Sequence, residues 1–222
     1  MTEINQHQDV KDAIREAVQL GSDVHHKIKT MTLKALTTRQ LDMENIKNVA
    51  EEVSKGINEG VTTQSEHVKD AFVHSASALD NALAVVAETS KLAIEEAASR
   101  VNEYSQHDLN GASKDLQDME GLFLDTLEKV AKGGNQVVAD IVGDFVSHAR
   151  QSGTAVGKQA LAALETLKEL PHWGKETVIS NTVAATITLA QIGNSILLGI
   201  AESLQPSHSK NNKPGTLCCG KC

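Results

Sequence analysis

The chain has 222 residues, of which 40% are hydrophobic and only 2% aromatic, and its formal net charge at neutral pH is −8. So few aromatic residues argue against a sheet-rich fold, because strands are enriched in aromatic and β-branched side chains. Lysine and arginine are interspersed with acids, which excludes the clustered positive charge of proteins that bind nucleic acid without sequence preference. We therefore expect an all-α protein that binds no nucleic acid.

Apolar and small residues recur along the chain at steps of three and four, the spacing of amphipathic helices. The Thr37-Thr38 pair and Asp42 are both candidate N-caps of the second helix. A turn or kink is expected near Gly60, and the Asn110-Gly111 pair predicts a reversal of direction. A fourth pattern continues through Gly133-Gly134, which loosen it. The predicted helices span residues 7–36, 42–57, 68–104, 113–167 and 174–204.

These helices predict an elongated bundle over residues 1–205, followed by a flexible cysteine-containing tail over residues 206–222. Many positions of the apolar stripes hold Ala, Gly or Ser, so each helical turn buries little apolar area. Such helices need additional partners, and we expect a homo-oligomer. Two glycine pairs, Gly56 with Gly60 and Gly153 with Gly157, either let another helix approach closely or only make their helices flexible.

The last predicted helix carries no charged residue between Glu176 and Glu202. It is therefore a buried helix of the bundle, a helix that binds a partner or an interface, or a membrane span. A polar stripe of Asn181, Thr188, Gln191 and Ser195 favours the first two interpretations. The predicted binding face on the other side consists of Val183, Ile187, Ala190, Leu197 and Ile200.

All three cysteines lie at the C-terminal end, so no disulfide framework holds the predicted bundle together, and a reducing cytoplasm fits best. Cys219 and Cys222 have the spacing that lets two thiolates bind one metal ion or form a local disulfide. Cys218 lies beside them, and His208 could supply a fourth ligand. The alternative is an exposed tail without chemistry of its own.

Catalytic motifs are missing from the sequence, which contains no phosphate-binding loop, dinucleotide fingerprint, nucleophile elbow or zinc-protease motif. The one Glu-x-x-His sequence, Glu169 to His172, contains a helix-ending proline and does not suit a di-iron site. His67 and His74 fit solvated positions beside an apolar stripe better than metal ligation. We expect a protein that is not an enzyme and needs no cofactor.

Three segments carry a resemblance to a known group of proteins: residues 31–36, 121–127 and 201–206. They resemble an uncharacterised bacterial family of all-helical proteins of about this length, which implies no activity and no site residues. In style the helices are also similar to phasins, the amphipathic proteins that coat polyhydroxyalkanoate granules. That likeness is an analogy and rests on no specific motif.

Three functional hypotheses follow. The first is a cytoplasmic, phasin-like association protein that binds a lipid or polymer-granule surface, or a partner, and so lies at the periphery of a membrane or granule. The second is a self-assembling helical scaffold, in which the same apolar stripes pack within and between subunits. The third is metal or thiol chemistry carried by the C-terminal tail.

Overall fold

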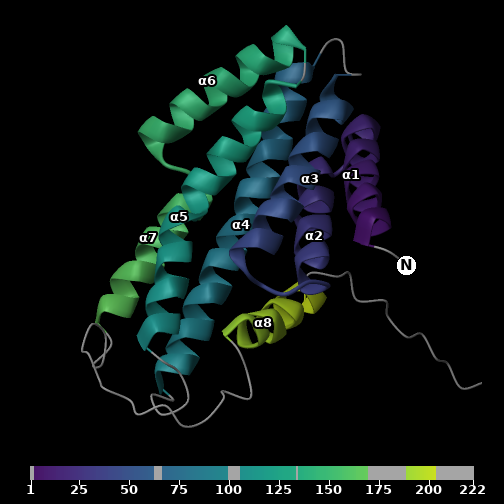
Figure 1. Ribbon diagram of the computed structural model, residues 1–222. Coiled ribbons are helices and arrows are strands. Elements are labelled where there is room, and N and C mark those ends of the chain that lie inside the picture. The colour runs from purple at the N-terminus through teal and green to yellow at the C-terminus, as the bar shows by residue number, and fades with distance from the viewer. Residues whose placement is uncertain (1–2, 63–66, 100–105, 134, 170–188, 204–222) are drawn as a thin grey trace, which may run out of the picture.

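The computed structural model describes residues 3–62, 67–99, 106–133, 135–169 and 189–203, and these residues form an elongated bundle of α-helices (Figure 1). The predicted all-α fold is thereby confirmed. The predicted tail over residues 206–222 lies outside the described residues. The helices are α1 Glu3–Leu20, α2 Val24–Thr37, α3 Met43–Val61, α4 Val68–Ser99, α5 Gln106–Ala131, α6 Gln136–Ser152, α7 Ala155–Lys168 and α8 Leu189–Ser203.

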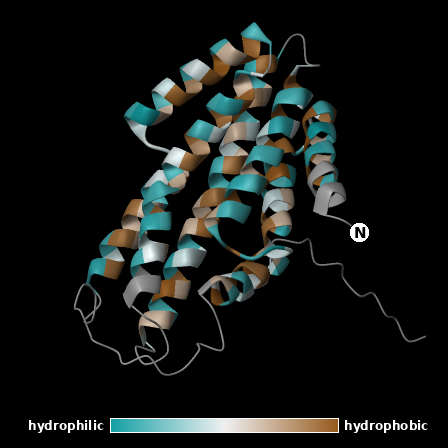
Figure 2. Ribbon diagram, viewed as in Figure 1, coloured by the Kyte–Doolittle hydropathy of each residue, from teal (hydrophilic) through white to brown (hydrophobic). Residues whose placement is uncertain are grey.

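Helix α4 lies at the centre of the bundle and packs against α2, α3, α5, α6, α7 and α8. Its 32 residues correspond to about 48 Å of helix at 1.5 Å per residue. Between Asp70 and Glu88 its only acidic residue is Asp80, and the side chains around it are mostly alanine, leucine and valine. This composition suits a helix that is surrounded by neighbours on several sides. Figure 2 shows hydrophobic residues along α4 and its neighbours.

Helix α1 packs closely against α3 because two glycines of α3 leave room for its backbone. A β-carbon added to Gly56 would lie 2.5 Å from the carbonyl oxygen of Lys11, and one added to Gly60 would lie 2.7 Å from the β-carbon of Val18. Both glycines are buried and lie within α3, which ends at Val61, so the turn or kink expected near Gly60 takes the form of a helix end one residue later, without a kink at Gly60 itself. Of the two interpretations of this glycine pair, close approach is confirmed.

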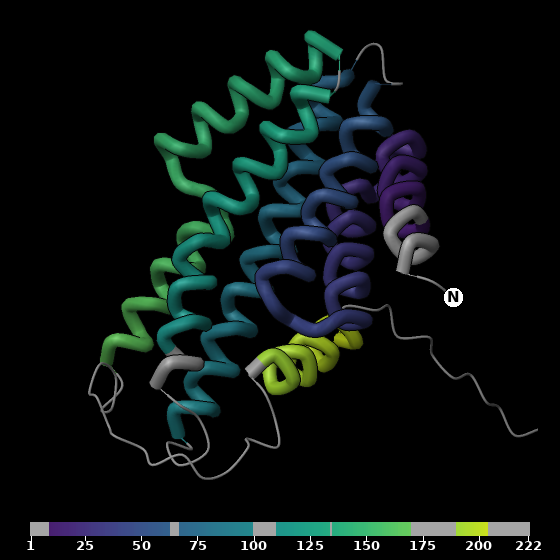
Figure 3. Tube along the Cα trace, in the orientation of Figure 1, coloured from purple at the N-terminus to yellow at the C-terminus, as the bar shows by residue number. Residues whose placement is uncertain are grey.

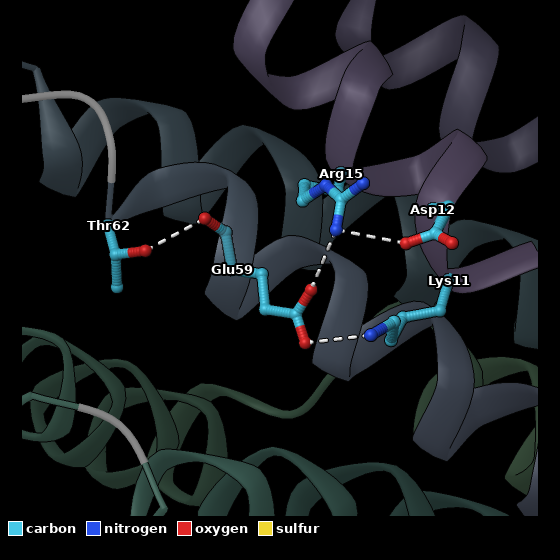
Figure 4. Close-up of polar contacts among 5 residues, drawn as sticks. All are labelled: Lys11, Asp12, Arg15, Glu59 and Thr62. Carbon is cyan, nitrogen blue, oxygen red and sulfur yellow. Dashed lines mark hydrogen bonds and ion pairs between the residues drawn. The ribbon is translucent and has the colours of Figure 1, made fainter. Parts of the chain in front are cut away.

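Charged side chains border the same contact between α1 and α3 (Figure 4). Glu59 accepts from Lys11 at 3.0 Å and from Arg15 at 3.4 Å, and Arg15 also pairs with Asp12 at 2.9 Å. Exposed pairs of this kind contribute about 0–1 kcal/mol each to stability. We therefore attribute the contact mainly to the buried glycine and apolar surface.

The single helix predicted over residues 7–36 is wrong, because the chain forms two helices there. Gly21 has φ of 67° and Asp23 has φ of 51°, and both values are left-handed conformations that end a right-handed helix. Helices α1 and α2 then pack against each other (Figure 1). The break lets Ile14 of α1 and Ile28 of α2 both enter the core, where each is fully buried.

The long fourth pattern is also divided, into α5, α6 and α7, which follow one another in a zigzag (Figure 3). Asn135 and Thr154 are the N-caps of α6 and α7, and Gly153 ends α6 with φ of 75°. The expected reversal of direction is present, since α5 runs back alongside α4 (Figure 1), but its expected position at Asn110-Gly111 is wrong, because both residues lie within α5. Both residues are exposed. Residues farther along α5 pack into the core.

Helix α6 lies obliquely over α5 and the beginning of α4 (Figure 1). Its Phe145 ring makes edge-on contacts with Phe72 of α4 at 5.8 Å and with Phe123 of α5 at 6.5 Å between ring centres. Such edge-to-face pairs add about 0.5–1.5 kcal/mol beyond the area they bury. Val137 at the start of α6 is 59% exposed, so this helix covers the bundle only along part of its apolar face.

Candidate functional site

The surface helix α8 packs across α2 and α4 (Figure 1). Gly193, Leu197 and Ala201 are spaced four apart and form its buried stripe, with Leu197 fully buried. A β-carbon added to Gly193 would lie 2.7 Å from Cδ2 of Leu41, so this glycine allows α8 to approach the loop before α3. We call these three residues the inner stripe of α8.

The polar contact between α8 and the bundle is incomplete. The Nδ2 of Asn194 donates to the carbonyl oxygen of Thr37 at 3.5 Å, the upper limit for a hydrogen bond. The Oδ1 of Asn194 is buried without a hydrogen-bond partner. A buried polar atom left unpaired costs about 1–3 kcal/mol, so this residue weakens the attachment of α8.

A second apolar row lies beside the inner stripe. Ile192, Ile196 and Ile200 are also spaced four apart, and each is only partly buried. We call these three residues the isoleucine flank. The remaining side of α8 is exposed and holds Gln191 and Ser195, together with Leu198, which is 47% exposed. The apolar arc of α8 is therefore wider than the part that the bundle covers.

The binding face predicted from the sequence is divided by the structure. Leu197 points into the bundle, whereas Ala190 and Ile200 are partly buried. Val183 and Ile187 lie outside the described residues. Sequence reasoning did not identify Ile192 and Ile196 as part of the surface, because their exposure depends on the way α8 packs across the bundle. Within the polar stripe, Gln191 and Ser195 are exposed as expected, and Asn181 and Thr188 lie outside the described residues.

A pair of carboxylates from two other helices holds the N-terminus of α7. Asp80 of α4 accepts from the backbone N–H groups of Ala155 at 2.7 Å and Val156 at 2.8 Å. Glu120 of α5 accepts from the backbone N–H of Thr154 at 2.9 Å and from its hydroxyl at 2.7 Å. The first N–H groups of a helix have no partners within the helix, and these carboxylates supply them.

Burial raises the pKa of Asp80, and the charge of Glu120 acts in the same direction. The two backbone hydrogen bonds and the charge of Lys158 oppose this rise. Desolvation is the largest of these effects, because Asp80 is only 9% exposed. Sequence reasoning missed this carboxylate, although a lone acid within the apolar run of α4 was a visible signal. Its hydrogen bonds explain its position as an anchor for α7.

The predicted metal ligands Cys218, Cys219, Cys222 and His208 lie outside the described residues. Within the ranges that the structure describes, no three His, Cys, Asp or Glu side chains come together as a metal site. His67 and His74 are both exposed, and Nδ1 of His74 lies 2.8 Å from the backbone oxygen of Asp70.

An open groove of about 500 Å³ lies between α3 and α5. Its walls carry charges of both signs, among them Glu51 and Lys129, which form an ion pair at 2.7 Å. Met43 and Leu122 add apolar surface, and Thr126 adds a hydroxyl group that is almost completely buried. Its ionisable lining residues are three carboxylates and two lysines, Glu51, Asp118, Asp125, Lys47 and Lys129.

Comparison with known proteins gives a family for residues 1–206. The chain belongs to the family of unknown function DUF6781. No curated protein and no solved structure matched the chain. The match agrees with the predicted uncharacterised family, and it provides no link to phasins.

Among the described residues, each helix is too short or too polar to cross a bilayer. Helix α8, the most apolar of them, has 15 residues, whereas a span needs about 20.

Proposed function

We propose that this protein is a non-enzymatic association protein that binds an uncharged apolar surface through the isoleucine flank of α8. The observation that carries the proposal is the partial exposure of Ile192, Ile196 and Ile200 on a helix that lies at the surface of the bundle. Each of these side chains can bury more apolar area at a contact than it buries in the isolated chain. Complete burial of an isoleucine side chain contributes about 1.5–3 kcal/mol.

The charge of α8 indicates which kind of surface it would bind. The helix contains one charged residue, Glu202, and no lysine or arginine. Helices that bind anionic membranes combine an apolar face with basic side chains, which gain energy from the lipid charge. A helix that binds a neutral lipid or polymer surface does not need basic side chains. This supports the phasin-like hypothesis in a specific form, namely attachment to an uncharged apolar particle.

A self-assembling scaffold is the second candidate. Large apolar side chains on other helices favour it, since Leu20 of α1 is 64% exposed and Leu161 of α7 is 62% exposed. A second copy of the chain could cover these residues or the isoleucine flank. The two candidates differ in what covers the flank, so one pair of variants tests both.

The test is flotation with triolein droplets coated with phosphatidylcholine, together with sedimentation of the protein alone. The flank variant carries Ile196→Asp and Ile200→Asp, and its matched control carries Gln191→Asp and Ser195→Asp on the exposed polar side of the same helix. We expect the wild type and the control to float with the droplets. The flank variant should lose at least about 90% of droplet binding, because each aspartate would have to enter an apolar phase.

Three outcomes separate the candidates. Loss of droplet binding with an unchanged melting temperature and sedimentation coefficient supports the association protein. Loss of an oligomer in the flank variant, without droplet binding by the wild type, favours the scaffold instead. Wild-type protein that neither floats nor oligomerises contradicts both. Vesicles of pure phosphatidylserine serve as a further arm, and stronger binding to them than to the droplets would contradict an uncharged target.

A further inference from the structure

The inner stripe and the isoleucine flank are adjacent rows of the same helix. Gly193 follows Ile192 and Leu197 follows Ile196, so the two rows together form one continuous apolar face. The bundle covers the inner stripe and leaves the isoleucine flank partly exposed. If α8 left the bundle, both rows would be presented on one side, while Gln191 and Ser195 would remain on the polar side.

The attachment of α8 favours such a release in two ways. The unpaired Oδ1 of Asn194 would regain a water partner when α8 leaves, because a buried polar atom is less favourable than a hydrated one. The hydrogen bond from Asn194 to Thr37 has a length of 3.5 Å, so little polar energy is lost. The inner stripe itself is apolar, so an apolar particle can bury Leu197 and Ala201 in place of the bundle.

We infer that α8 is a releasable helix whose inner stripe is exchanged between the bundle and an uncharged apolar surface. In the closed state α8 covers its own strongest binding residue, Leu197. In the open state the inner stripe and the isoleucine flank bind together. The inference rests on the proposed function and adds its regulation: the closed bundle limits binding, because only the fraction of molecules with α8 released uses the full face.

A disulfide between α8 and α4 tests the release directly. A β-carbon built at Gly193 lies 3.8 Å from the β-carbon of Ala93, within the range of about 3.5–4.5 Å found in disulfides. The variant carries Ala93→Cys and Gly193→Cys in a full chain whose Cys218, Cys219 and Cys222 are changed to serine. The Leu41 side chain, whose Cδ2 lies closest to the new β-carbon, can rotate away because this atom is at its flexible end.

Binding to the same triolein droplets is measured in oxidised and in reduced protein, with the two single-cysteine variants as controls. We expect the oxidised protein to bind at least about tenfold more weakly than the reduced protein, and reduction to restore binding. Equal binding in both states overturns the inference and leaves the proposed function standing, since the isoleucine flank would then suffice. Absence of binding by the reduced protein overturns the proposed function, and the inference with it.

A second variant needs no oxidation. Asn194→Leu removes the unpaired oxygen and should hold α8 more tightly to the bundle, although it also makes the helix more apolar. If release limits binding, this variant binds the droplets more weakly than the wild type, by about threefold or more. If hydrophobicity of α8 alone decides, the variant binds more strongly, and the inference is overturned. Asn194→Gln, which keeps an amide, is the matched control.

Discussion

Asp80 shows how one buried acid positions an entire helix. Its carboxylate accepts hydrogen bonds from the first two N–H groups of α7. The first of these, Ala155, lies 75 positions after Asp80 in the chain. Asp80 therefore connects the central helix α4 to α7, while Glu120 connects α5 to the same end. Burying this carboxylate has a desolvation cost, and that cost raises the pKa of Asp80.

The first prediction concerns the pH dependence of this anchor. Because the pKa of Asp80 is raised by folding, the folded state binds its proton more tightly than the unfolded chain does. Its contribution to stability is thus complete below the ordinary value of 3.8 and is lost as pH rises through the raised pKa. In Asp80→Asn this contribution is absent. The unfolding free energy of the wild type minus that of Asp80→Asn should therefore fall as the pH rises above the ordinary value of 3.8 and through the raised pKa.

Urea denaturation at several pH values measures this difference. Asp144→Asn on the exposed side of α6 controls for the loss of one negative charge. A difference that rises with pH would show that the backbone hydrogen bonds outweigh desolvation, which is the opposite of the stated order.

At the scale of elements, contact between α1 and α3 depends on the absence of two side chains. The glycine positions face backbone and β-branched side chains of α1, which cannot move aside without shifting the helix. The α5 glycine at position 121 offers a contrast, because a β-carbon added there meets no atom within 4 Å.

The second prediction uses these two glycines as a matched pair. Gly56→Ala should lower the free energy of unfolding by about 1–3 kcal/mol, because the added methyl group would overpack the contact with Lys11 and Ile14. Gly121→Ala should raise it by up to about 1 kcal/mol, since alanine favours a helix interior and the site is open. Thermal and urea unfolding check both values, and a stabilised Gly56→Ala would contradict the close packing.

The third prediction concerns the inner stripe of α8. Leu197→Asp places a charge at a fully buried position, and even truncation of a core leucine costs about 2–5 kcal/mol. We expect α8 to leave the bundle while the helices around α4 stay folded. Hydrogen exchange should then become fast in α8 and stay slow in α4. Ser195→Asp on the exposed side controls for the charge, and loss of protection throughout the bundle would show that α8 is essential for folding.

At the scale of the whole molecule, most of the large apolar side chains of the described residues are used within the chain, around α4. The exposed ones lie on different helices, with Leu20 on α1, Leu161 on α7 and Leu198 on α8. Individual exposed apolar residues are normal in soluble domains, whereas contiguous ones mark interfaces. The isoleucine flank is therefore the more specific candidate for a contact surface.

The fourth prediction is that the protein self-associates at micromolar concentration. The reason is that exposed apolar side chains such as Leu20 and Leu161 can be covered when two copies of the chain associate. Sedimentation velocity over a range of concentrations measures the association, and the flank variant shows whether α8 takes part. A stable monomer at high micromolar concentration contradicts this prediction.

The all-α fold and the helical character of most segments could be predicted from the sequence alone. Of the two expected N-cap sites, Asp42 is confirmed, whereas the Thr37-Thr38 pair forms the C-terminal end of α2. These features depend on local spacing and on neighbouring backbone groups, which the order of residues specifies directly. The close approach at Gly56 and Gly60 was one of two interpretations, because a glycine pair does not reveal which helix will face it. The apolar nature of α8 was also visible from its lack of charge.

Only the tertiary structure decided where the long helical patterns break and which face of α8 is covered. Gly21 and Gly153 adopt left-handed conformations because neighbouring helices fold back at those points, and the α7 end is held by carboxylates from α4 and α5. Likewise, Leu197 is buried and Ile196 partly exposed because α8 crosses α2 and α4 in one orientation. Helical periodicity places both residues on an apolar arc, but contacts between residues distant in sequence determine which side of that arc meets the bundle.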